Sequence, residues 1–257
     1  MSAVTRDELM AVAAARHIRD GDVLFVGTGL PMVAGYLAKA THAPNAVLVF
    51  ESGVVDARPR ELATGVGDFR LVGSASYRTG LAETLGMLDA GRVDLGFLGA
   101  AEVDRHGNVN STVIGEYASP AVRLPGSGGA NDIASCAKRF VIIARHDRRR
   151  FPARLSYVTT PGFLSGGAAR GENGLPGGGP AGVVTDLGTF SFDAEGAMQI
   201  DTLHPGVTVE QVLAATAFPL GGADREPPQT PLPDAEEIRL LRERIDPAGV
   251  YLSRDRR

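Results

Sequence analysis

The segment Val47-Leu48-Val49-Phe50-Glu51-Ser52-Gly53 constrains the fold of this chain more than any other. Its apolar residues predict a buried strand, most simply in a parallel sheet, and the glycine ends it. Glu51 therefore stands where the strand becomes a loop, the edge at which open α/β sheets bind ligands and place catalytic groups. A carboxylate is costly to bury, so a Glu at this place is paired, catalytic or turned into solvent. This segment alone leaves the three alternatives open.

Strands and helices alternate through the first part of the chain. Thr5 and Glu8 have the spacing of a capping box, and Pro31 suits the start of a second helix that runs to Ala40. Further strands are predicted at residues 23–26, 70–75 and 94–98, and a further helix at 80–90. The alternation predicts an α/β fold with a doubly wound, mostly parallel sheet.

The second half of the chain has a different pattern. Strand-like segments with little helix between them predict added mixed or antiparallel strands; they are residues 140–144, 157–164, 183–192 and 198–203. The glycine-dense segment 165–180 is interpreted as a mobile surface loop, with a lid as the alternative. The predicted domains are a main domain at 1–220, a Pro-rich linker at 221–232, and a C-terminal amphipathic helix and tail at 233–257.

Composition and charge exclude several classes of protein. Over 257 residues the net charge is −4, and the longest basic run, residues 148–150, is short, so no nucleic-acid partner is expected. Cys136 is the single cysteine, which excludes an intrachain disulfide and a cysteine metal cluster. The histidines lack a metalloprotease spacing, and we predict no metal. Without a secretory segment or an apolar run of roughly 18 residues, the chain is expected in the cytoplasm, with no membrane partner.

Three further segments carry groups that suit chemistry. The loop 27–31 is either an anion site or a tight turn. Consecutive glycines at 126–132 let two N–H donors face one oxygen, as an oxyanion hole requires, while Asn131 or Asp132 is also suited to cap the following helix. Glu102 stands near the end of a predicted strand and before a turn at 104–108, in which His106 is expected to be exposed.

Three of these segments together resemble the β subunits of class I CoA-transferases, particularly the glutaconate CoA-transferase β-subunit group. The segments are 50–53, 101–110 and 126–132, and two later ones, 184–190 and 203–208, are similar to the same family. The resemblance covers residues 5–220, with the five motifs in the family's order. It implies the CoA-transferase fold.

The resemblance also implies a mechanism. Glu51 would attack an acyl-CoA thioester and become a glutamyl-CoA thioester, with ping-pong kinetics. Backbone groups would bind CoA or stabilise oxyanions at Gly128, Gly129, Ala130 and Gly53. Possible supporting residues are Ser52, Glu102, Asn108 and Asn131. Coenzyme A would be substrate and carrier, and no metal or redox cofactor is expected.

The same resemblance implies a partner. The family works as a heterodimer or heterotetramer with an α subunit, so this chain alone is expected to be inactive. Its substrates would be an acyl-CoA and a carboxylic acid, either dicarboxylic or 3-oxo. A terminal carboxylate on the substrate needs a cation, for which Arg58, Arg60 and Arg78 are candidates by position only.

Two departures from the family's pattern stand out. Glu102 occupies a position that is commonly Gln, and Ser52 replaces the Asn of the more familiar Glu-Asn-Gly triplet. That triplet does occur at residues 172–174, but in the glycine-rich loop without a preceding strand, and it is interpreted as a decoy. The alternative functions are a CoA-thioester or ring-opening hydrolase resembling those of steroid catabolism, and a non-enzymatic scaffold. Retention of Glu51 favours transfer.

Overall fold

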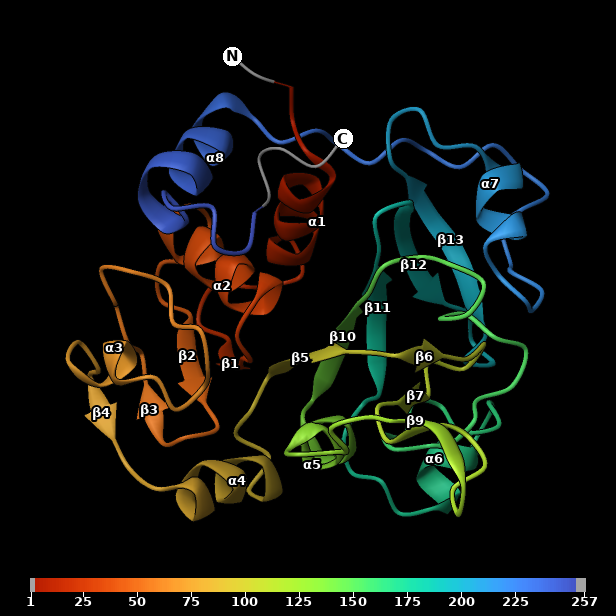
Figure 1. Cartoon of the computed structure of the whole chain (residues 1–257), viewed down its shortest axis with the longest axis horizontal. Helices are drawn as coiled ribbons and strands as arrows, with labels where there is room; N and C mark the ends of the chain where they lie inside the picture. Colours follow the sequence, from red (N-terminus) through yellow and green to blue (C-terminus); the bar gives the residue numbers. More distant parts are fainter. Residues whose placement is uncertain (1–2, 253–257) are drawn as a thin grey trace. The chain divides into compact units, whose positions relative to one another are not determined.

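The computed structural model describes residues 3–252. Its contacts divide the chain into two compact units: unit 1 comprises residues 1–97 and 231–257, and unit 2 comprises residues 98–230. Both units are visible in Figure 1. The predicted domain bounds at residues 220 and 232 stay a prediction, because packing contacts do not measure independent folding.

Unit 1 is built on a sheet of parallel strands extended by two antiparallel ones. In spatial order the strands are β5 (Leu95–Gly99), β1 (Val23–Phe25), β2 (Val47–Phe50), β3 (Val54–Val55) and β4 (Tyr77–Arg78). β1 pairs in parallel with β5 and β2, whereas β3 runs antiparallel to β2 and β4. Because β2 and β3 are joined by a tight turn, the residues between them are held at the carboxyl end of a buried strand.

The helices of unit 1 begin where the sequence predicts. Thr5 caps α1 (Arg6–Ala15) with a complete capping box, and α2 (Leu30–Ala40) begins next to Pro31. The other helices are α3 (Phe69–Val72), α4 (Leu81–Asp89), α8 (Ala235–Leu240) and the π-helical turn η1 (Leu241–Ile245). Figure 1 shows α1, α2 and α8 gathered together. Glu8 on α1 accepts two hydrogen bonds, at 2.6 and 2.9 Å, from Arg242 of η1, which ties the C-terminal helix to the first one.

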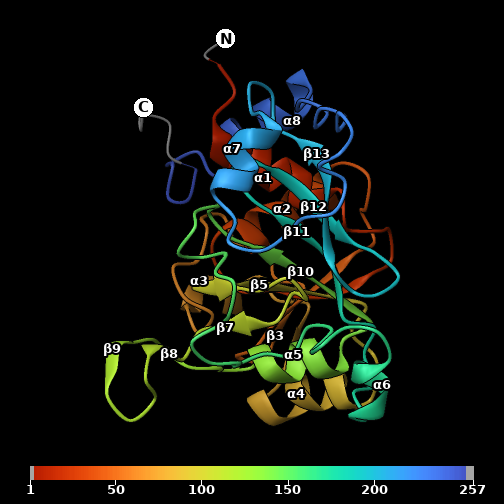
Figure 2. The same ribbon diagram turned by 90° about the vertical axis from the view of Figure 1, so that its right-hand side faces the viewer.

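Unit 2 carries the mixed and antiparallel strands. Its main strands lie in the order β10 (Arg139–Ile143), β11 (Pro180–Val184), β12 (Gly188–Phe192) and β13 (Met198–Leu203). Two hairpins accompany them: β6 (Glu102–Val103) with β7 (Val109–Asn110), and β8 (Val113–Gly115) with β9 (Pro120–Arg123). The helices are α5 (Ala130–Cys136), α6 (Ala169–Glu172) and α7 (Val209–Ala214). Figure 2 shows the β8–β9 hairpin standing clear of the rest of unit 2. The predicted α/β class, with antiparallel strands added in the second half, is confirmed.

Two predicted strands are wrong, and a third is interrupted by a turn. Residues 70–75 do not form one, because Asp68 caps a short helix, α3 (Phe69–Val72), by accepting the N–H of Arg70. Residues 157–164 are irregular except for a single bridge between Val109 and Thr160.

The segment 183–192 is two strands and a turn. Thr185 Oγ1 accepts the backbone N–H groups of Leu187 and Gly188, at 3.1 and 3.3 Å, and so folds β11 and β12 into a hairpin. A side-chain oxygen that accepts backbone N–H groups two and three residues on stabilises a turn, which the apolar pattern of this segment conceals.

The glycine-rich segment 165–180 is anchored to the rest of unit 2, in contrast to the mobile loop that the sequence predicts. Arg170 on α6 is buried and donates to the carbonyl oxygens of Gly177 at 2.7 Å and Gly162 at 2.8 Å, and also to that of Ala134. A buried guanidinium has five donors to satisfy, and here backbone carbonyls from several segments satisfy them. Glu172 ends a helix with no strand before it, consistent with the decoy interpretation. Within residues 3–252, no helix is long and apolar enough to cross a membrane.

Candidate active site

Glu51 is the first residue of the turn between β2 and β3. The turn is closed by a hydrogen bond of 3.0 Å from the N–H of Gly53 to the carbonyl oxygen of Phe50. The Glu51 carbonyl oxygen accepts the Thr84 hydroxyl at 3.0 Å, which fixes the backbone at this point. Among the described residues, none forms a hydrogen bond or ion pair with the Glu51 carboxylate. The side chain is half-buried, and this carboxylate lies at a strand end without a partner among residues 3–252.

Gly53 is required by the geometry of this turn. Its φ is +97°, in the left-handed region that favours glycine, and a Cβ at this position would overlap the carbonyl oxygen of Thr79. Its N–H is used within the turn and its carbonyl accepts the N–H of Thr79. Gly53 therefore shapes the turn that presents Glu51, and its N–H is not available to an oxyanion. Ser52 donates its hydroxyl to the carbonyl of Val66 at 2.5 Å, which holds the turn to a neighbouring loop.

The glycine segment of unit 2 offers two free N–H donors. Gly128 has a φ of +49°, and Gly129 is the N-cap of α5 with no side-chain cap. The N–H of Ala130 donates to the carbonyl oxygen of Ser127 at 3.0 Å, so it is occupied. Within residues 3–252, the N–H groups of Gly128 and Gly129 have no acceptor. Of the four backbone positions predicted to bind CoA or an oxyanion, Gly53 and Ala130 have occupied N–H groups, and Gly128 and Gly129 remain.

The predicted capping role of Asn131 or Asp132 is wrong. Both lie inside α5, whose N-cap is Gly129. Asn131 instead donates from Nδ2 to the carbonyl oxygen of Thr159 at 2.9 Å, and its N–H donates to Ser127 Oγ at 3.1 Å. These contacts fix the start of α5 against the irregular segment near residue 159.

Glu102 is buried and fully engaged in hydrogen bonds. Its Oε2 accepts Asn110 Nδ2 at 2.6 Å and the N–H of Ser156 at 2.9 Å, and its Oε1 accepts the Ser156 hydroxyl at 3.0 Å. The carboxylate thus joins β6, β7 and the segment at 156. Its supporting role is positional, because neither of its oxygens lacks a donor.

Asn108 holds the turn that precedes β7. Its Nδ2 donates to Asp104 Oδ2 and to the carbonyl of Leu164, both at 2.8 Å, and its Oδ1 accepts the N–H of Gly162 at 2.7 Å. Burial raises the pKa of Asp104, although the hydrogen bonds from Asn108 and His106 act in the opposite direction. His106 is half-buried, with Nδ1 2.9 Å from the Gly196 carbonyl oxygen, and the expected full exposure is wrong.

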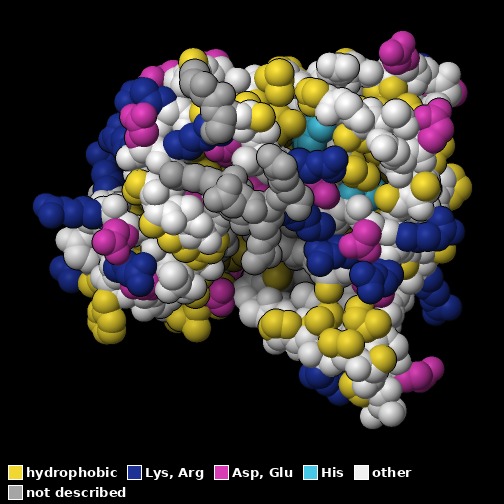
Figure 3. All heavy atoms as spheres, turned by 45° about the horizontal axis from the view of Figure 1, so that its top comes forward, with side chains coloured by type: hydrophobic (Ala, Val, Ile, Leu, Met, Phe, Trp, Pro, Cys, Tyr) yellow, Lys and Arg dark blue, Asp and Glu magenta, His cyan; other side chains and the backbone are white. Residues whose placement is uncertain are grey.

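Unit 2 contains an open cavity of about 860 Å³ beside this network. Its lining residues are Gly99, Ala100, Ala101, Glu102, Ser111, Ile114, Val122, Leu124, Pro125, Asp147, Arg149 and Arg150. Ser111 Oγ donates to the carbonyl of Gly126 at 2.8 Å, so the cavity adjoins the glycine segment. Figure 3 shows apolar side chains gathered on the projecting lower-right part of the surface, over the β8–β9 hairpin. The cavity therefore has an apolar wall and a basic rim.

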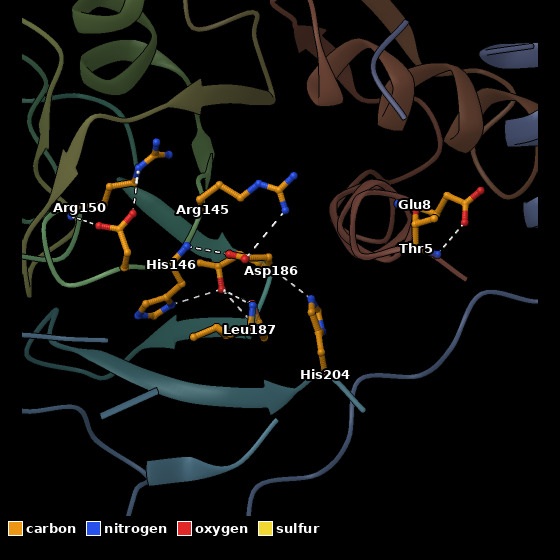
Figure 4. Close-up of polar contacts among 11 residues, drawn as sticks. Thr5, Glu8, Arg145, His146, Arg150, Asp186, Leu187 and His204 are labelled. Atoms are coloured by element: carbon orange, nitrogen blue, oxygen red, sulfur yellow. Dashed lines mark hydrogen bonds and ion pairs between the residues drawn. The ribbon is translucent and has the colours of Figure 1, made fainter. Parts of the chain in front are cut away.

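The two later motifs meet at the β11–β12 turn. His204 Nε2 donates to the Thr185 carbonyl oxygen at 2.8 Å, and its Nδ1 lies 2.8 Å from Thr230 Oγ1. His146 lies beside them, and its backbone N–H donates to Asp186 at 2.7 Å, as Figure 4 shows. Burial lowers the pKa of His146 to about 4, although the charges of Asp186 and Asp147 act in the opposite direction. These buried contacts make the motifs structural in unit 2.

The fold and these motifs define a class of CoA-dependent enzyme, and comparisons with known proteins identify it. The family model for Coenzyme A transferase matches residues 8–215. The β subunit of 3-oxoadipate CoA-transferase from Pseudomonas knackmussii is 43% identical over 244 residues, covering 94% of each chain. The crystal structure of glutaconate CoA-transferase from Acidaminococcus fermentans matches with a TM-score of 0.91 and 37% identity, covering 98% of each chain. A third relative, the cholesterol ring-cleaving hydrolase IpdB subunit of Mycobacterium tuberculosis, is 31% identical over 256 residues, 96% of each chain.

This chain belongs to the Coenzyme A transferase family. The resemblance drawn from the sequence is confirmed, including the glutaconate CoA-transferase group. No sequence signal indicated Ser156 or Arg170, because their contacts join segments far apart in the chain.

Proposed function

We propose that this chain is the β subunit of a heteromeric CoA-transferase that moves CoA between an acyl-CoA and a dicarboxylic or 3-oxo acid. The observation that carries the proposal is the placement of Glu51: its carboxylate stands at the end of a buried strand without a partner among the described residues. A carboxylate without hydrogen-bond donors is a better nucleophile because nothing stabilises its charge, and Glu51 has no donor among residues 3–252.

The proposed reaction proceeds through covalent intermediates on Glu51. A carboxylate oxygen of Glu51 attacks the thioester carbonyl, the C–S bond breaks, and CoA leaves as thiolate. The thiolate then attacks the glutamyl carbonyl of the resulting anhydride, which releases the first acid and leaves a glutamyl-CoA thioester. The acceptor acid runs the same two steps backwards. No redox cofactor is needed, because no step changes an oxidation state, and the proposed steps use no metal.

The glycine segment supplies the proposed electrostatic stabilisation. Negative charge develops on the carbonyl oxygen in each addition step, and backbone N–H groups without other acceptors stabilise it at no cost in reorganisation. The N–H groups of Gly128 and Gly129 fit this role, whereas that of Ala130 is occupied.

The cavity of unit 2 supports a dicarboxylic substrate. Arg149 at its rim is almost fully exposed, with a side-chain exposure of 97%, and its contact to Asp147 is long, at 4.0 Å. A guanidinium there can pair with a substrate carboxylate. The named substrates of the two transferase relatives, 3-oxoadipate and glutaconate, are both dicarboxylates.

The proposed partner is an α subunit. The 3-oxoadipate and glutaconate CoA-transferase relatives are each named as one subunit of their enzyme, so each works with a second polypeptide. We therefore expect activity only when the chain is produced together with its α subunit, in a heterodimer or heterotetramer.

The test is steady-state transfer by the complex, with glutaryl-CoA or a 3-oxoacyl-CoA as donor. Wild type should give the parallel-line pattern of ping-pong kinetics, and Glu51→Gln should lower kcat by about 10³-fold or more. Glu172→Gln, in the other Glu-Asn-Gly context, is the matched control and should retain the wild-type rate. Transfer that survives Glu51→Gln contradicts the proposal.

The likeness to the ring-cleaving hydrolase subunit supports one alternative, hydrolysis on the same fold. A hydrolase would release free CoA without an acceptor acid and would tolerate Glu51→Gln if another residue were the base. The acceptor requirement in the same assay therefore separates the two functions.

A further inference from the structure

Unit 1 contains a second hollow that the proposed transfer chemistry does not use. It has a volume of about 500 Å³ and is lined by Tyr36, Lys39, Ala40, Pro44, Arg58, Pro59, Arg60, Leu62, Arg244 and Ile245. A smaller hollow of about 380 Å³ shares Arg58, Pro59 and Arg60 and adds Glu61, Arg70, Gly73 and Ser74. We call the larger hollow the basic pocket.

The basic pocket carries more positive charge than the protein around it neutralises. Four of its lining residues are cationic and none is acidic. Asp56 pairs with two of them, Lys39 at 2.7 Å and Arg58 at 3.5 Å. Arg60 and Arg244 form no ion pair or side-chain hydrogen bond with any residue in 3–252. In the described part of the chain, Asp56 is thus the carboxylate that forms ion pairs with the pocket cations, and two of the four stay without one.

Such an arrangement suits an anion that carries phosphate. Cations gathered around a hollow with low-dielectric walls raise the local potential and concentrate anions there. Three of the four are arginines, whose planar forks bind phosphate oxygens in a bidentate manner. The remaining walls are apolar or aromatic, with Tyr36, Pro44 and Ile245 among them. The volume lies in the range of small-molecule pockets.

The basic pocket lies away from Glu51 within unit 1. Lys39 donates both to Asp56 and to the carbonyl of Ala46, the residue before β2, whereas Glu51 follows the other end of that strand. Four extended residues span roughly 13 Å, so the two ends of β2 cannot share one carboxylate substrate.

We propose that the basic pocket is a binding site for a small phosphorylated ligand with a planar or apolar body, of the nucleotide type, distinct from the reacting acyl group. Its phosphates pair with Arg60 and Arg244, and its body lies against Tyr36 and the prolines. The inference does not depend on whether Glu51 carries out transfer.

The test is isothermal titration of the full chain with four probes: inorganic phosphate, pyrophosphate, ADP and CoA. ADP should bind saturably, more tightly than pyrophosphate, and more weakly as salt rises. The double variant Arg60→Gln, Arg244→Gln should weaken ADP binding at least tenfold. The double variant Arg60→Lys, Arg244→Lys should have an ADP affinity between that of wild type and that of the Gln variant, because lysine keeps the charge but cannot bind phosphate in a bidentate manner. If CoA binds more tightly than ADP, and the Arg60→Gln, Arg244→Gln double variant abolishes that binding, then the ligand of the basic pocket is CoA.

Arg19→Gln with Arg92→Gln is the charge-matched control, since both are exposed residues of unit 1 outside the pocket. It should leave ADP binding unchanged. The proposal is overturned if none of the four probes binds saturably, or if the control pair weakens ADP binding as much as the pocket pair. Far-ultraviolet circular dichroism of each variant separates lost binding from lost folding.

Discussion

Asn110 Nδ2 lies 2.6 Å from Oε2 of Glu102, and both side chains are buried in unit 2. The second carboxylate that the sequence places near a strand end is thus a fixed structural acceptor, whereas the Glu51 carboxylate has no partner among the residues of 3–252. The two glutamates therefore differ in their surroundings: Glu102 is held by hydrogen bonds, and Glu51 is not.

Glu102→Gln should cost less than about 1 kcal/mol of unfolding free energy. The Gln oxygen can accept from Asn110 and the Ser156 N–H, and its amide N–H can donate to the Ser156 hydroxyl, so every bond in the network is kept. Glu102→Ala should cost about 3 kcal/mol because it leaves buried donors unsatisfied. Urea unfolding measures both. Equal losses for the two variants would contradict the network.

Gly53→Ala should destabilise the protein and lower activity by distorting the turn at Glu51. The added methyl group meets the Thr79 carbonyl oxygen at a φ of +97°, and backbone strain of this kind costs at least about 1–3 kcal/mol. Gly91→Ala is the control, since φ is +65° there but nothing lies near its Cβ. Thermal unfolding should separate the two. If the two variants lose similar stability, the positive φ alone, and not the overlap with the Thr79 carbonyl oxygen, accounts for the destabilisation.

The buried ion pair between Glu8 and Arg242 should contribute stability at neutral pH. Burial by itself raises the pKa of Glu8, but the hydrogen bond and charge of Arg242, together with Thr5, outweigh it and lower the pKa. Arg242→Met leaves a buried carboxylate unpaired and should cost about 3 kcal/mol. A carboxyl with a lowered folded pKa stabilises the fold above its unfolded pKa, and this stability is lost as pH falls through the folded value.

The difference between wild type and Arg242→Met should therefore shrink on acidification towards pH 3. Arg244→Gln, an exposed neighbour without an ion pair in the described part of the chain, is the control and should change stability by less than about 0.5 kcal/mol. Urea unfolding at two pH values gives the result. A pH-independent difference would contradict the role of the Glu8 charge.

His146 should make unit 2 sensitive to acid. Its ring stacks on Phe151 at 3.9 Å between centroids and is buried, which lowers its pKa to about 4 from 6.5. A histidine with a depressed folded pKa takes up a proton on unfolding, so its contribution is present above the unfolded pKa and is lost as pH falls towards about 4. The slope is up to about 1.4 kcal/mol per pH unit.

His146→Gln should flatten this pH dependence while keeping a donor for the Thr216 hydroxyl, which lies 2.9 Å from His146 Nε2. His42→Gln, at an exposed site, serves as control and should not flatten it. The measurement is the urea midpoint between pH 7 and pH 4.5. An unchanged slope in His146→Gln would contradict the assignment.

Local patterns account for what the sequence predicted well. The capping box at Thr5, Pro31 at the start of α2, and the strand that ends before Glu51 all depend on residues within a few positions of one another. Such signals are present in the sequence itself.

Two kinds of contact account for what the sequence could not predict: local side-chain caps that override an apolar pattern, and contacts between segments far apart in the chain. Residues 70–75 are apolar enough for a strand, and the Asp68 cap decides for a helix. The segment 165–180 has few apolar side chains, yet Arg170 anchors it through carbonyls at residues 134 and 162. A single buried cation whose partners lie far along the chain produces no hydrophobic periodicity from which its contacts could be predicted.

The most direct test of the central claim is to locate the covalent intermediate. The chain, purified together with its α subunit, is exposed to glutaryl-CoA or a 3-oxoacyl-CoA, quenched with borohydride, digested and analysed by mass spectrometry. The account predicts a modified peptide in which the changed residue is Glu51, absent from Glu51→Gln and retained in Glu172→Gln. Release of CoA with Glu51 unmodified and no acceptor acid required would contradict it and favour hydrolysis.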